Sequence, residues 1–184
     1  MEHWDPLLIN NYDLFQKKKR IVMRKLGMCK GKEGLPIQWT NMTVSYNEDN
    51  KETVIGLKVK VLKEVSNNFS MTFNFWKCDA SGNPDSCECI LKDYNNKQIC
   101  KYMVMKNQAW TEFIDHFDKP LRCPIKPGEY NLVNCPIKSD FLRYLPVSDA
   151  LWKVIMWGYD LDEPISCVDM EMQVAAFLGG KRRG

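Results

Sequence analysis

The sequence lacks long apolar runs and has almost no histidine. No run of about 18 apolar residues, the length that suggests a membrane-spanning helix, occurs among its 184 residues. The two histidines are His3 and His116, and there is no Gly-x-Ser-x-Gly elbow, His-Glu-x-x-His motif or phosphate-binding loop. We therefore expect neither an enzyme nor a cofactor. Acidic residues that resemble a catalytic carboxylate pair occur at Asp160 with Asp162 and Glu163, but their surroundings predict a solvated hairpin turn.

A strong charge of one sign is also missing. The net charge of +3 is too small to indicate a nucleic-acid partner. Basic residues cluster at 17–20 and 181–183, where we expect solvated segments; the alternative is contact with anionic lipid head groups, at about 1 kcal/mol per residue. No low-complexity linker divides the chain. We expect one domain over residues 1–178, with residues 1–28 at its periphery, and a flexible basic tail at 179–184.

Cysteine, by contrast, is plentiful and spread over the whole chain. The eight cysteines are Cys29, Cys78, Cys87, Cys89, Cys100, Cys123, Cys135 and Cys167. Only one pair is close in sequence, so a disulfide framework is favoured over a zinc site, and no metal is expected. Disulfides indicate an oxidising compartment and hence a secreted protein. Residues 1–11 do not look like a signal peptide, which would have been removed before this numbering begins. Asn41 and Asn68 are candidate glycosylation sites.

Alternating apolar residues predict β-strands. Phe69, Met71, Phe73 and Phe75 alternate with polar residues, which is typical of a sheet with one buried face. A similar alternation at 57–61, separated from them by turn residues, predicts an antiparallel hairpin. Further strands are expected at 38–46, 128–137, 151–159 and 165–175, with a hairpin at 159–164 and a loop at 79–86.

The apolar spacing changes to a helical period between residues 98 and 117. The residues with this spacing are Ile99, Tyr102, Met103, Trp110, Phe113, Ile114 and Phe117. One amphipathic helix at about 98–117 is therefore predicted, ending before Pro120. Many short strands and one helix indicate an all-β fold, either a two-sheet antiparallel sandwich, a barrel or an open cup, with the helix across a sheet edge or mouth.

The apolar composition fits two kinds of interior. Ten methionines, six tryptophans and eight phenylalanines are many for this length. Methionine adapts to irregular apolar partners, which suits a ligand cavity, but the same residues also fill an ordinary core. Composition alone leaves both interpretations open.

Several segments resemble a known family. Residues 123–130, 144–146, 151–159 and 165–167 are similar to the lipid-recognition proteins related to ganglioside activator protein and the lysosomal cholesterol-transfer protein. A closer resemblance, to the insect CheB chemosensory proteins, is carried by Cys100–Met103, Lys106–Thr111, Leu121–Cys123 and Ser166–Cys167. It covers the second half of the chain well and the first half only by strand pattern. The resemblance implies a cup of two antiparallel sheets with an apolar interior.

The resemblance also implies how the cysteines pair and what the protein binds. The implied disulfides join Cys29 with Cys167, Cys78 with Cys87, Cys89 with Cys135, and Cys100 with Cys123. The implied ligand is an acyl chain, sterol, glycolipid tail or hydrocarbon semiochemical, which the protein would carry or present. The candidate cavity residues are Phe69, Met71, Phe73, Phe75, Tyr102, Trp110, Phe113, Trp152, Val154, Met156, Met170 and Met172. The alternative is an extracellular interaction module with a solid core that binds a receptor or another protein.

Overall fold

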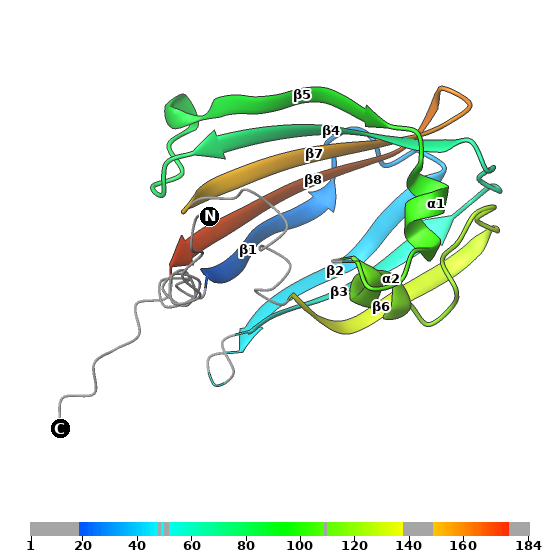
Figure 1. Cartoon of the computed structure of the whole chain (residues 1–184), viewed down its shortest axis with the longest axis horizontal. Coiled ribbons are helices and arrows are strands. Elements are labelled where there is room, and N and C mark those ends of the chain that lie inside the picture. Colours follow the sequence, from blue (N-terminus) through cyan, green and yellow to red (C-terminus); the bar gives the residue numbers. More distant parts are fainter. Residues whose placement is uncertain (1–18, 48, 50–51, 109, 138–148, 177–184) are drawn as a thin grey trace, which may run out of the picture.

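The computed structural model (Figure 1) describes residues 19–47, 49, 52–108, 110–137 and 149–176, which form two antiparallel sheets. The five-stranded sheet has the strand order β1-β8-β7-β4-β5, and the three-stranded sheet has the order β2-β3-β6. The strands are β1 (Lys19–Met28), β2 (Ile37–Asn47), β3 (Glu52–Val61), β4 (Phe69–Cys78), β5 (Glu88–Asn96), β6 (Gly128–Ile137), β7 (Ala150–Asp160) and β8 (Glu163–Ala176). The predicted two-sheet antiparallel sandwich is confirmed.

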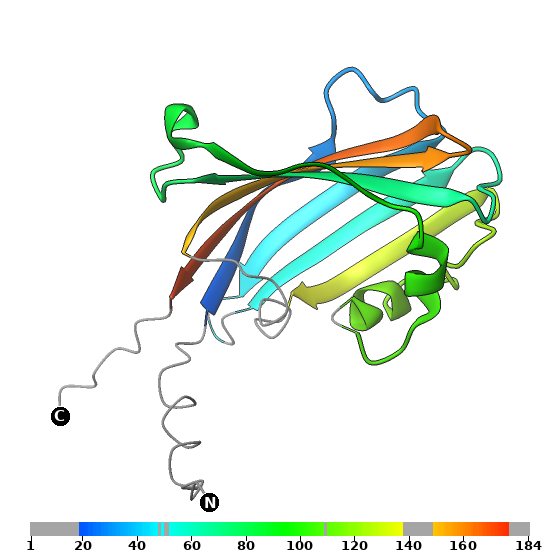
Figure 2. The ribbon, with the colours of Figure 1, turned by 45° about the horizontal axis from the view of Figure 1, so that its top comes forward.

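The two sheets face each other as separate layers (Figure 2), and β1 contacts β2 and β3 where the layers meet. Polar bonds link the layers here. The Thr53 hydroxyl of β3 donates to the Ile21 carbonyl of β1, and Thr53 is only 2% exposed. No described strand pairs with β5 on its far side or with β6 on its far side, so the sandwich is joined along one side and has open sheet edges along the other.

The hairpin predicted between residues 57–61 and 69–75 is wrong. The first run belongs to β3 in the three-stranded sheet and the second to β4 in the five-stranded sheet. The connecting segment crosses between the layers because Val65 is fully buried and pairs with Ile125. Ser66 then anchors the crossing by donating its backbone N–H to the Asp160 carboxylate at 3.1 Å. Asp160 therefore has a structural partner at the turn, and the hairpin that follows it, between β7 and β8, is confirmed.

The N-terminal segment is not peripheral over residues 19–28. These residues form β1, an edge strand that pairs with β8 along its whole length. Ile21 and Met23 are buried in the core at 5% and 9% exposure. Apolar residues that alternate over a short stretch were enough to build a half-buried strand. Residues 1–18 and the basic tail at 179–184 lie outside the described residues.

The single helix predicted at about 98–117 is also wrong, because the structure contains two short helices, α1 (Ile99–Val104) and α2 (Thr111–Asp115). The chain leaves helical geometry at Met105, which is extended, and Asn107 has a left-handed φ of 59°. The Thr111 hydroxyl donates to the Met105 carbonyl at 3.1 Å and accepts the Gln108 N–H at 2.9 Å. Such side-chain bonds to the backbone compete with helical hydrogen bonds and close the connection.

Three disulfides brace the described residues. They join Cys29 with Cys167, Cys78 with Cys87, and Cys100 with Cys123, as the resemblance implied. The first connects the segment after β1 to β8, the second joins the ends of β4 and β5, and the third ties α1 to the segment before β6.

The implied bond between Cys89 and Cys135 does not form. Cys89 lies exposed on β5, where its sulfur is 3.7 Å from the Leu91 carbonyl oxygen. Cys135 lies on β6 in the other sheet, where it is 2% exposed and its sulfur is 3.9 Å from the Pro136 carbonyl oxygen. The two cysteines therefore belong to different layers and face different surroundings.

The buried side chains form two clusters. The larger one joins the buried side chains of the three-stranded sheet to Phe69 and Ile165 of the five-stranded sheet, with Phe117 and Ile125 beside them. The smaller one lies on the inner face of the five-stranded sheet, toward β1, and contains Ile21, Met23, Ala150, Trp152, Val154, Met172 and Val174. Leu26 and Ile137 pack against both clusters and connect them. The candidate site depends on the residues of the five-stranded sheet that neither cluster covers.

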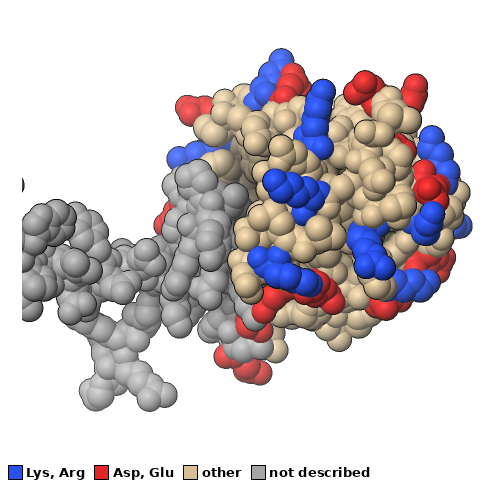
Figure 3. Space-filling model, turned by 45° about the vertical axis from the view of Figure 1, so that its right-hand side comes forward, with Lys and Arg blue, Asp and Glu red and all other residues tan. Residues whose placement is uncertain are grey.

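The surface carries both signs of charge. In Figure 3, Lys and Arg side chains lie among Asp and Glu over the same face. On the outer face of the five-stranded sheet, Lys25 pairs with Asp169, and this hydrogen bond raises the pKa of Lys25. No helix within the described ranges is long and apolar enough to span a membrane.

Candidate ligand-binding face

Nine of the twelve predicted cavity residues share one face of the five-stranded sheet. The strand β4 pairs with β7 without a register shift, so its alternate residues Phe69, Met71, Phe73 and Phe75 point to one side. Their neighbours in the sheet, Trp152, Val154 and Met156 of β7 and Met170 and Met172 of β8, continue the same face. We call these nine residues the inner face.

The inner face is best covered at Val154 of β7 and becomes more exposed toward β5. One row across the sheet runs from Met170 through Val154 and Phe75 to Leu91 of β5. Val154 is 1% exposed, Phe75 is half-buried, and Leu91 is 37% exposed. The opposing sheet therefore covers the β7–β8 part of this face more completely than the β4–β5 part.

Phe73 is the inner-face residue with the least core contact. It is half-buried and belongs to neither cluster, whereas Met71 packs against the larger cluster and Phe75 against the smaller. Its ring neighbours are Phe75, with centroids 6.3 Å apart, and Tyr94 of β5, at 6.4 Å. Tyr94 is 51% exposed. The three rings form an aromatic surface that the rest of the described structure leaves partly uncovered.

The end of the inner face near α1 and α2 is closed. Phe69 is 8% exposed and Phe117 is 7% exposed, both within the larger cluster. At Gly158, an added Cβ would lie 3.1 Å from the Phe69 ring, so the backbone of β7 approaches this ring closely. The Trp39 indole N–H donates to the Ser166 hydroxyl at 3.0 Å, linking β2 to β8 across the interior.

The three predicted residues from the helical region do not act together. Phe113 packs against the larger cluster and meets Phe117 edge-on, with ring centroids 5.7 Å apart. Tyr102 and Trp110 instead pack against each other, also at 5.7 Å, and the Trp110 indole donates to the Tyr102 carbonyl at 2.8 Å. Phe113 therefore helps to close the end of the interior. Tyr102 and Trp110 stabilise the connection between the two helices.

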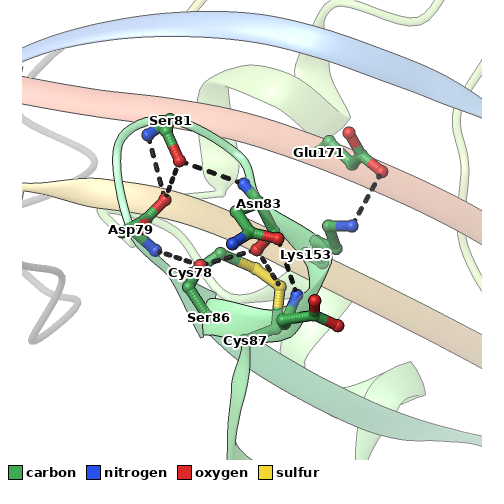
Figure 4. Close-up of a disulfide and its surroundings, with 9 residues drawn as sticks. Cys78, Asp79, Ser81, Asn83, Ser86, Cys87, Lys153 and Glu171 are labelled. Atoms are coloured by element: carbon green, nitrogen blue, oxygen red, sulfur yellow. Dashed lines mark hydrogen bonds and ion pairs between the residues drawn. A yellow bond between two sulfur atoms is a disulfide. The ribbon is translucent and has the colours of Figure 1, made fainter.

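The opposite end of β4 is fixed by the Cys78–Cys87 disulfide and the loop that it closes (Figure 4). The Asp79 carboxylate accepts the Ser81 N–H at 3.0 Å, and the Ser81 hydroxyl holds the pKa of Asp79 below its usual range. The Asp79 N–H donates to the Ser86 hydroxyl at 3.0 Å. This network fixes the loop, and with it the ends of β4 and β5 beside the inner face.

Sequence reasoning missed the contributions of β5 and of Lys77. Leu91 and Tyr94 extend the inner face, but β5 is exposed along almost its whole length and shows no alternation to detect. Lys77 continues the spacing of Phe69–Phe75 by two more residues, which is a signal the sequence does contain. Asn41 and Asn68 are both exposed, and their glycosylation stays a prediction.

The described residues include no group of three or more His, Cys, Asp or Glu side chains that could hold a metal ion. No protein-family model matches the chain, and no curated protein matches it. A solved structure to which the chain is similar is the crystal structure of a Niemann-Pick type C2 protein from the Japanese carpenter ant. The sequence identity is 14% and the TM-score 0.36, over 80% of this chain and 96% of that chain.

Proposed function

We propose that the protein binds an apolar or amphipathic small molecule against its inner face and acts as a secreted carrier or presenter. The observation that carries this proposal is the incomplete burial of Phe73 on the inner face. Phe73 lies outside both clusters, and the aromatic surface that it forms with Phe75 and Tyr94 is only partly covered. Apolar area gives about 25 cal/mol per Å² when it leaves water, so a hydrocarbon chain laid on these rings binds without polar contacts.

The neighbouring features support the same role. The methionines Met71 and Met156 border the aromatic surface, and methionine side chains adjust to ligands of different shape. The three disulfides agree with an oxidising compartment and therefore with secretion. The sequence resemblance to ganglioside-activator-like and CheB proteins favours a fatty acyl, sterol, glycolipid or hydrocarbon ligand, with a chemosensory role within that range.

The test is extraction followed by uptake. The purified protein is extracted with organic solvent, the extract is analysed by mass spectrometry, and the stripped protein is titrated with a fluorescent fatty-acid probe. Phe75→Glu places a charge on the inner face, and Val133→Glu, at a residue 63% exposed on β6, is the matched control. We expect stoichiometric uptake by the native chain and the control, and loss of uptake in Phe75→Glu.

The competing function is an extracellular interaction module with a filled interior. The exposed apolar residues Ile90 and Tyr94 on β5, at 52% and 51%, favour it, because such residues also suit a protein partner. Absence of both co-purified lipid and probe uptake in the folded native chain would contradict the carrier proposal and leave the interaction module. Binding to a receptor would then be sought with Ile90→Glu as the disrupting variant.

A further inference from the structure

The inner-face residues of β4 form an apolar row along the strand, made up of Phe69, Met71, Phe73 and Phe75. Lys77 places a positive charge at the C-terminal end of this row. Because β4 and β7 pair without a shift, Lys77 lies on the same face as Phe73 and Phe75. Its partner across the sheet is Trp152, which is 6% exposed and belongs to the smaller cluster. On this face the neighbours of Lys77 are therefore the apolar Phe75 and Trp152, together with Glu88, which lies opposite it on β5.

The charge of Lys77 has no ion-pair partner among the described residues. The side chain is half-buried, and Glu88 lies opposite it on β5, but no salt bridge joins the two within the described part of the chain. Lys153, one position along β7 on the outer face, differs in this respect because it pairs with Glu171 at 3.7 Å. An ammonium beside an apolar surface, with which no carboxylate of the described residues forms a salt bridge, is available to an anion that arrives with the ligand.

The geometry of the row fits one acyl chain. Met71 to Lys77 spans six residues, or about 20 Å at roughly 3.3 Å per residue. One leaflet of a bilayer core, whose full thickness is about 30 Å, holds an acyl chain within about 15 Å. The far end of the row is closed by Phe69 and Phe117, each less than a tenth exposed. A chain lying along the row therefore has its end methyl near Phe69 and its head near Lys77.

We propose that the ligand is a single-chain amphiphile with an anionic head, and that the Lys77 ammonium donates to a carboxylate or phosphate oxygen of that head. This inference rests on the proposed function and adds its ligand class. Phe73 and Phe75 contact the hydrocarbon chain, and Lys77 selects the head group. Lys77 is thus a specificity-determining residue, whose loss changes which ligand binds more than whether a chain binds.

The experiment compares three ligands of equal chain length, palmitic acid, hexadecanol and hexadecyl phosphate, by displacement of a fluorescent probe at neutral pH. The variants are Lys77→Met, which keeps the apolar stem, Lys77→Arg, which keeps the charge, and Lys153→Met as the outer-face control. We expect the native chain to bind one or both anions about tenfold more tightly than the alcohol. Lys77→Met should lose that preference and keep its affinity for hexadecanol, whereas Lys77→Arg and Lys153→Met should retain the preference.

The outcomes separate this inference from the function on which it rests. Equal affinity for the anions and the alcohol in the native chain, or a preference that survives in folded Lys77→Met, overturns the assignment of Lys77 and leaves lipid binding intact. If the native chain binds none of the three, the proposed function itself fails. The ratio between palmitic acid and hexadecyl phosphate identifies the head group. Should Lys77→Met not fold, loss of the preference in Lys77→Gln tests the same point.

Discussion

Truncating Phe73 should separate ligand binding from stability. Replacing a fully buried phenylalanine with alanine costs about 3–5 kcal/mol of unfolding free energy. Phe73 is half-buried, lies in neither core cluster and has the rings of Phe75 and Tyr94 as its aromatic neighbours, so we expect Phe73→Ala to cost about 1–2 kcal/mol. Leu132 is 2% exposed within the larger cluster, and Leu132→Ala should cost about 2–5 kcal/mol.

The two variants should have the opposite order in binding. If a ligand covers the exposed part of the Phe73 ring, on the order of 50 Å², the lost apolar contact amounts to about 1 kcal/mol, or roughly fivefold in Kd. Leu132 lies in the packed cluster away from β5, so the affinity of the folded Leu132→Ala variant should stay within about twofold of the native value. Urea denaturation measures the stability of each variant, and titration with the fluorescent probe measures its affinity.

A reversed result would refute the partly uncovered aromatic surface. If Phe73→Ala were as destabilising as Leu132→Ala and bound the probe as the native chain does, the Phe73 ring would be ordinary core. The interior would then be filled, and the interaction module would be the better account of this protein.

Three further expectations follow from the fold. Removing the Cys29–Cys167 disulfide should lower the free energy of unfolding by about 5 kcal/mol, and removing Cys78–Cys87 should lower it by about 3 kcal/mol. The difference is expected because the bridged residues are 138 and 9 positions apart. Urea denaturation of each double alanine variant checks the order. Gly158→Val should displace the Phe69 ring and lower the unfolding free energy by about 1–3 kcal/mol in the same assay, whereas unchanged stability would contradict the close approach. Cys89 should react with a maleimide in the native protein. A peptide map in which Cys89 is disulfide-bonded to another cysteine would contradict the disulfide assignment.

Two strands were not predicted from the sequence, β1, which buries Ile21 and Met23, and β5, which buries neither face. Phe69–Phe75 alternates because β4 needs apolar residues on its inner face only, and that period is visible in any sequence. The residues of β5, Glu88–Asn96, are exposed on an edge, so no face is selected for apolar residues. Its position comes from backbone pairing with β4 and from the Cys78–Cys87 bridge, neither of which leaves a period in the sequence.

Where the apolar and turn patterns failed, individual contacts that those patterns do not encode decided the structure. The spacing of apolar residues at 98–117 is helical, yet Thr111 bonds to Met105 and divides the helix. The turn residues at 66–68 suggested a hairpin, but burial of Val65 between the layers sends the chain to the other sheet. The Cys89–Cys135 pairing failed for the same reason, because only the assembled sheets determine that the two residues lie on different layers.

The disulfides help to explain how an uncovered apolar surface is tolerated. Cys29–Cys167 ties the connection after β1 to β8, and Cys100–Cys123 ties α1 to the segment before β6. In the chain-entropy model, such bridges contribute roughly 3–5 kcal/mol each by restricting the unfolded chain. That is comparable to the loss expected when one large side chain lacks its packing partners. The sandwich can therefore stay folded while Phe73 and its neighbours lack cover, and a carrier that must release its ligand needs this stability in the empty state.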